Sequence, residues 1–162
     1  MMNSSLFSHA EQPEPAKKTT SVPDVVVERR VPCELHEAFN GFTEYIHLWW
    51  PEESTEFGEG THPEFETAAL TETGLEGESA VWATVAGMVQ DSEISLEWVA
   101  RHSPQTPTAV KISFTPVDEA TTLVTLSHTR FGSVADPAEV QADFAALWPQ
   151  VLGRYARFMG AR

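Results

Sequence analysis

The sequence has one cysteine, few basic residues and no long apolar run. The single Cys33 excludes an internal disulfide framework and fits a reducing compartment. The 10 Lys and Arg stand against 24 Asp and Glu, so the net charge is -14. This charge opposes binding to nucleic acid or to anionic lipid, which depends on basic side chains. Without a membrane-length apolar segment or a signal-peptide pattern, we expect a cytoplasmic protein with no membrane insertion.

Negative charge gathers in residues 52–97, which contain twelve Asp or Glu and no Lys or Arg. A run of this kind is usually a solvated face. The alternative is an acidic face that docks a basic protein partner or divalent cations. We also expect an exposed sheet edge near residues 54–70, which would permit a homodimer.

The chain divides into a tail and one domain. Residues 1–23 contain three prolines and two lysines and have almost nothing apolar to bury, which predicts a disordered tail. Residues 24–162 have a length typical of a single folded domain.

The domain is predicted to begin with a strand and two short helices. The β-branched run Val25–Val31 indicates the strand, which Pro32 ends. Apolar residues at helical spacing follow, and we expect Gly41 to divide them into two helices, the second ending at Pro51.

A series of about six strands is predicted next, because alternating apolar residues are separated by turn residues. Short connections imply an antiparallel sheet. The expected strands are a weak edge strand at 54–57, runs at 63–70, 79–89 and 93–100, and two more around Phe114 and His128.

The C-terminal segment predicts one long helix. Asp136 and Pro137 suit its start, with the Asp136 side chain accepting backbone N–H groups. An apolar stripe continues to Phe158 and should lie on the sheet. Pro149 should cause a bend or local break near Trp148. The element order predicts an α+β fold with its helices on one side of the sheet.

The adjacent Trp49 and Trp50 are the most informative local feature. Neighbouring side chains on a helix point about 100° apart, so the two indoles must pack on different neighbours. We expect Trp49 in the core and Trp50 facing a space between the sheet and the C-terminal helix.

Four short motifs resemble the SRPBCC or START-like superfamily, especially its branch related to the activator of the heat-shock protein ATPase. They are V-P-C-E-L-H-E-A-F at 31–39 with W-W-P at 49–51, V-W-A-T-V at 81–85 with L-E-W at 96–98, T-L-V-T-L-S-H at 122–128, and L-W-P-Q-V-L at 147–152.

This resemblance implies a helix-grip fold, in which a curved antiparallel sheet of six to seven strands wraps around the long C-terminal helix. It also implies a deep apolar cavity, used in members of the superfamily for lipids, polyketides, plant hormones or aromatic substrates. The sequence departs from the branch pattern at Ala83, where a glycine is usual, and at the turn 90–92. We expect these changes to narrow the space and to alter the cavity rim.

Strand alternation and helix periodicity give the candidate cavity residues, since ligand pockets are mainly apolar and aromatic. His128 shares a face with apolar residues, so it is either a hydrogen-bonded core histidine or a group that orients or protonates a ligand. The candidates for ligand binding are Phe42, Trp50, Trp82, Trp98, Phe114, His128, Phe144, Trp148 and Tyr155.

The favoured function is binding of a small hydrophobic or aromatic ligand in this cavity. One alternative is a cyclase- or dehydratase-like enzyme in which His128 or Tyr155 moves protons. Another is a co-chaperone-like interaction module that uses the acidic face. Glu44 with His47, and His62 with Glu64, offer metal-ligand types without the spacing of a metal site. We therefore expect no metal, no cofactor and no assigned catalytic residue.

Overall fold

The computed structural model describes residues 21–100 and 105–162. Most of the predicted tail, residues 1–20, lies outside the described part. Within that part, no helix is both long enough and apolar enough to cross a membrane.

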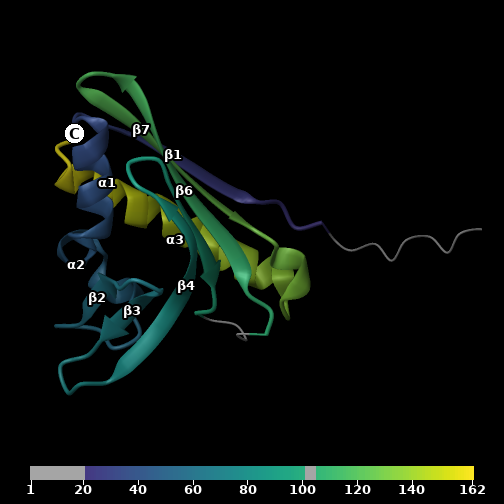
Figure 1. Ribbon diagram of the computed structural model, residues 1–162. Coiled ribbons are helices and arrows are strands. Elements are labelled where there is room, and N and C mark those ends of the chain that lie inside the picture. Colours follow the sequence, from purple (N-terminus) through teal and green to yellow (C-terminus); the bar gives the residue numbers. More distant parts are fainter. Residues whose placement is uncertain (1–20, 101–104) are drawn as a thin grey trace, which may run out of the picture.

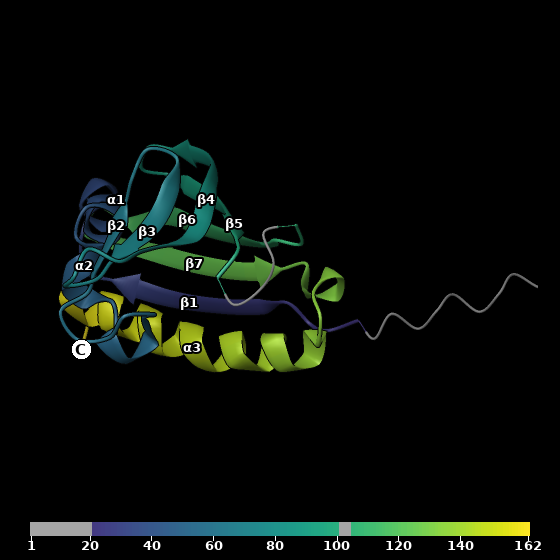
Figure 2. The same ribbon diagram turned by 90° about the horizontal axis from the view of Figure 1, so that it is seen from below.

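Seven strands form one antiparallel sheet in the order β1-β7-β6-β5-β4-β3-β2. The sheet curls around the long helix α3, with α1 and α2 at one end (Figures 1 and 2). The predicted α+β helix-grip fold is confirmed. The strands are β1 Val25–Val31, β2 His62–Phe65, β3 Ala69–Thr73, β4 Ser79–Val89, β5 Glu93–Trp98, β6 Thr108–Asp118 and β7 Thr121–Thr129.

The inner face of the sheet follows the predicted alternation. In β5, Ile94, Leu96 and Trp98 are buried. In β7, Leu126 and His128 are fully buried and belong to the same inward face. Because side chains alternate along a strand, these residues all lie on the inner face of the curled sheet.

The helix break after β1 is not where the sequence predicted it. Helix α1 covers Leu35–Thr43 and runs through Gly41, whereas α2 covers Ile46–Trp49. Gly41 instead permits a close approach, because a Cβ there would lie 2.2 Å from the sulfur of Met159.

The segment between α2 and β3 also differs from the prediction. Residues 54–57 form no strand: the 3-10 helix η1, Glu52–Ser54, is followed by a loop. The expected single run at 63–70 is two strands, β2 and β3. The physical reason is that the backbone N–H groups of Glu56 and Phe57 donate to the Glu72 carboxylate and not to a neighbouring strand.

Helix α3 spans Pro137–Phe158 after the short 3-10 helix η2, Phe131–Ser133. It is continuous through Pro149, so the predicted local break is absent. The predicted side-chain cap at Asp136 is also wrong. Asp136 has a left-handed backbone with φ 53°, and its side chain makes no capping hydrogen bond. Its carbonyl accepts the N–H groups of Glu139 and Val140 instead.

Candidate functional site

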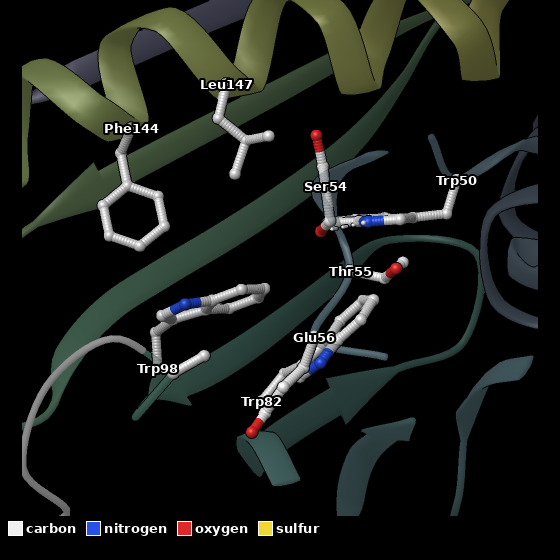
Figure 3. A pocket seen from close by; sticks show the side chains of 9 residues that line it. Trp50, Ser54, Thr55, Glu56, Trp82, Trp98, Phe144 and Leu147 are labelled. Atoms are coloured by element: carbon white, nitrogen blue, oxygen red, sulfur yellow. Dashed lines mark hydrogen bonds between the residues drawn. The ribbon is translucent and has the colours of Figure 1, made fainter. Parts of the chain in front are cut away.

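A cavity of about 330 Å³ lies between α3, the ends of β4 and β5, and the loop after α2. Figure 3 shows Phe144 and Leu147 extending from α3 toward Trp98 on the sheet. The cavity volume is at the lower end of the range for small-molecule sites. The cavity is lined by Trp50, Ser54, Thr55, Glu56, Trp82, Trp98, Ala100, Phe144 and Leu147.

Four aromatic rings form the deep wall of the cavity. The ring centroids of Trp50 and Trp82 are 4.8 Å apart, and those of Trp82 and Trp98 are 6.3 Å apart. Phe144 meets Trp98 edge-to-face at 6.1 Å. All four side chains are buried. Because each ring is held by others, the wall is preorganised for a flat or compact apolar group.

The rim of the cavity is polar and is held in place by hydrogen bonds. The indole N–H of Trp50 donates to the Ser54 carbonyl over 3.1 Å. Thr55 Oγ1 donates to the Glu52 carbonyl over 2.5 Å and accepts the Gly58 N–H over 3.0 Å. The loop is therefore fixed both to itself and to the aromatic wall.

A buried carboxylate, Glu72, anchors the same loop from below. It is 0% exposed. One oxygen accepts the N–H of Glu56 at 2.8 Å and the indole N–H of Trp82 at 3.0 Å. The other accepts the N–H of Phe57 at 2.8 Å and the Thr61 hydroxyl at 2.5 Å. Four donors on one buried carboxylate match its acceptor capacity and offset the cost of burying it.

Sequence reasoning placed Glu72 in the solvated acidic stretch and so missed this role. The available signal was strand alternation, since Leu70 and Glu72 are two residues apart and share a face. The sequence also missed the other non-aromatic lining residues. These are Ser54, Thr55, Glu56, Ala100 and Leu147.

Of the nine predicted cavity residues, the structure brings Trp50, Trp82, Trp98 and Phe144 to the cavity wall. The other five lie elsewhere, for two different reasons. Phe114 and Tyr155 both pack against Phe42, and Trp148 and His128 form a layer behind the wall. These five are Phe42, Phe114, His128, Trp148 and Tyr155.

Phe42 is the centre of the first group. Its ring lies 5.8 Å from Phe114, 5.2 Å from Tyr155 and 5.1 Å from Trp49. The Tyr155 hydroxyl donates to the Ala38 carbonyl over 2.7 Å. Burial strongly raises the pKa of Tyr155, so this phenol stays protonated. Aromatic packing thus fills the space that the prediction left open at this end of α3.

His128 lies behind Phe144, with ring centroids 4.4 Å apart. The indole N–H of Trp148 donates to Nδ1 of His128 over 2.9 Å. An indole only donates, so Nδ1 carries no proton, and Nε2 donates to Thr108 Oγ1 over 2.6 Å. The imidazole is therefore neutral, with both nitrogens in hydrogen bonds. This is the core-histidine interpretation of the two that the sequence allowed.

The unusual turn 90–92 was expected at the cavity rim, but it contacts the start of α1. Asp91 Oδ1 accepts a hydrogen bond from Nδ1 of His36 over 3.0 Å. This hydrogen bond, together with the negative charge of Asp91, raises the pKa of His36. The turn does not line the cavity.

His47 and His62, two of the metal-ligand types in the sequence, lie side by side with ring centroids 4.6 Å apart. In residues 21–100 and 105–162, no three His, Cys, Asp or Glu side chains come together in a way that could hold a metal ion.

The profile of the family described as "Activator of Hsp90 ATPase homolog 1-like protein" matches residues 32–160. The chain belongs to this family. The match covers both the helices after β1 and the whole of α3, so it includes every element that forms the cavity. No curated protein matches the chain.

Solved structures agree with the family at the level of fold. CalC, a self-sacrificing resistance protein from Micromonospora echinospora, is 17% identical with a TM-score of 0.60, over 85% of this chain and 94% of that one. Txn09, an anthrahydroquino-gamma-pyrone synthase complexed with SUM, is 21% identical with a TM-score of 0.57, over 85% and 97%. A protein from Staphylococcus saprophyticus is 16% identical with a TM-score of 0.60, over 85% and 91%.

Proposed function

We propose that this family member binds a small apolar or aromatic molecule in the cavity between the sheet and α3. The observation that carries the proposal is the wall of Trp50, Trp82, Trp98 and Phe144, largely buried side chains that line an open cavity of about 330 Å³. A ligand that fills the cavity removes its own apolar surface and that of the aromatic wall from water, which favours binding.

Binding is favoured over catalysis by the positions of the polar groups. His128 and Tyr155, the two groups considered for proton transfer, are each held in hydrogen bonds away from the cavity. Among the described lining residues only Glu56 has an ionisable side chain. General acid–base catalysis needs a group within hydrogen-bond reach of the reacting atom. The aromatic wall supplies none, and the Glu56 carboxylate belongs to an exposed residue at the rim.

The structural relatives support a cavity of this kind. Txn09 is an anthrahydroquino-gamma-pyrone synthase, and its structure is a complex with SUM. For the present chain, this likeness supports the proposal that the space beside α3 holds a compact aromatic compound.

The test is a titration with 2-naphthol, followed through the indole N–H signals of Trp50, Trp82 and Trp98 by NMR. Leu147→Trp should fill the cavity and weaken binding at least tenfold. Ala146→Trp is the matched control, because Ala146 is exposed on the same helix and does not line the cavity. Saturable shifts in the wild type and in Ala146→Trp, lost in Leu147→Trp, support the proposal. Unchanged spectra in the wild type would refute it for aromatic ligands of this size.

A further inference from the structure

The cavity has the composition of an aromatic cage with negative charge around it. Aromatic rings are negative at their faces, and indole attracts cations more strongly than phenyl does. Three of the four wall rings are indoles, from Trp50, Trp82 and Trp98. Their neighbouring ring planes are tilted by 42° and 39°, so they are not stacked flat against each other. Tilted rings can present faces to one enclosed group.

Two carboxylates lie next to this cage. Glu56 lines the cavity at its rim and is exposed. Glu72 is fully buried and accepts the indole N–H of Trp82 over 3.0 Å. An anionic acceptor on an indole N–H pushes electron density into the ring, which makes the face of Trp82 more attractive to a cation.

The net charge of the chain is also negative. No Lys, Arg or His is among the lining residues that the structure describes. The segment 52–97, which supplies four of the nine described lining residues, has twelve acidic and no basic residues, and the whole chain has a net charge of -14. Such a field raises the local concentration of cations and disfavours anionic ligands such as fatty acids.

We infer that the ligand of this cavity is an organic monocation, an alkylated ammonium group carried on a small apolar or aromatic body. The inference rests on the proposed binding function and names the chemical class of its ligand. The ammonium group is held by the faces of the three indoles near Glu56, and the apolar body contacts Phe144 and Leu147. Contact of the ammonium group with Glu56 and with the indole faces makes the cavity prefer a cation to a neutral ligand.

The experiment compares two probes of the same shape, (4-hydroxyphenyl)trimethylammonium and 4-tert-butylphenol, which differ in having N⁺ or C at one position. Affinities are measured at pH 6.5 by NMR titration of the full-length protein. We expect the cation to bind about tenfold more tightly than the neutral probe.

Three variants test which residues cause the preference for the cationic probe over the neutral one. Glu56→Gln should weaken the cation about threefold and leave the neutral probe unchanged, since it removes one nearby charge. Glu59→Gln changes the net charge equally at an exposed loop residue that does not line the cavity, and it should leave both affinities unchanged. Trp98→Phe should reduce the ratio of the two affinities, a readout that a purely structural role would not move.

Each outcome decides between the two proposals. If 4-tert-butylphenol binds as tightly as the cation, the cation inference is wrong and the binding function stands. If neither probe nor 2-naphthol binds, both are wrong. If Glu59→Gln weakens the cation as much as Glu56→Gln does, attraction comes from the general acidic surface, and the assignment of the charge preference to this cavity fails.

Discussion

Replacing Glu72 by glutamine tests whether the buried carboxylate holds the cavity rim. The amide keeps the shape of the side chain but has one acceptor oxygen and one donor NH₂ group. Glu56 and Trp82 donate to one carboxylate oxygen, and Phe57 and Thr61 donate to the other. In either orientation the NH₂ group must face an N–H donor that has lost its acceptor.

The expected destabilisation follows from these bonds. Hydrogen bonds to a charged group contribute about 1.5–3 kcal/mol each, and an unsatisfied buried donor costs about 1–3 kcal/mol. The loop donors of Glu56 and Phe57 can regain water, while the Trp82 N–H is buried. We therefore expect Glu72→Gln to lower the free energy of unfolding by about 3 kcal/mol.

Urea unfolding followed by far-UV circular dichroism measures this change. With a slope of about 2 kcal/mol per molar urea, the midpoint should fall by about 1.5 M. Glu76→Gln is the control, because Glu76 is exposed in the turn after β3. It should shift the midpoint by no more than about 0.25 M.

The effect should also be local. Amide hydrogen exchange at Glu56 and Phe57 should become faster in Glu72→Gln, because both N–H groups lose their acceptor, while exchange at Val124 in β7 should change only with global stability. Equal urea midpoints for Glu72→Gln and Glu76→Gln, with unchanged exchange at Glu56 and Phe57, would refute the reasoning.

Three further predictions concern other parts of the fold. The NMR titration of His36 should give a pKa above 6.5, and Asp91→Asn should bring it back toward that value; because the folded-state pKa is raised, the stabilisation is complete below pH 6.5 and is lost as the pH rises through the folded-state pKa. Gly41→Ala should cost about 1 kcal/mol in urea unfolding by displacing the Met159 side chain, and Met159→Ala should remove most of that cost; additive effects would contradict the contact. Cys33 should react with a thiol reagent far more slowly in the native protein than in urea, since burial and the nearby Glu37 and Glu34 raise its pKa, and equal rates would contradict this.

Strand alternation predicted the inner face of the sheet because each residue's side is fixed by its backbone position. Ile94, Leu96, Trp98 and His128 are all buried as that rule requires. The family motifs predicted the fold for the same reason, since they record which residues must face α3. The sequence alone therefore predicts which side of a strand faces the interior, whatever residues pack against that side.

The cavity itself could not be located in this way. Burial does not say whether the opposing surface is another side chain or a void, so Phe42 and Trp50 looked equivalent in the sequence. Phe42 meets four rings, whereas Trp50 faces the space beside Trp82. Strand alternation with Leu70 indicated that Glu72 is buried but not what it binds. Its four donors are two backbone N–H groups, the Trp82 indole and the Thr61 hydroxyl, and they come from residues 10 to 16 positions away.

Ring contacts connect all five tryptophans of the chain into one continuous path. Successive ring centroids are 6.0 Å apart for Trp49 and Trp50, 4.8 Å for Trp50 and Trp82, 6.3 Å for Trp82 and Trp98, and 5.1 Å for Trp98 and Trp148. At such separations, excitation energy moves between indoles faster than it is emitted. The five tryptophans therefore share their excitation energy. A single quencher in contact with the middle of the path should reduce the tryptophan fluorescence of the whole molecule.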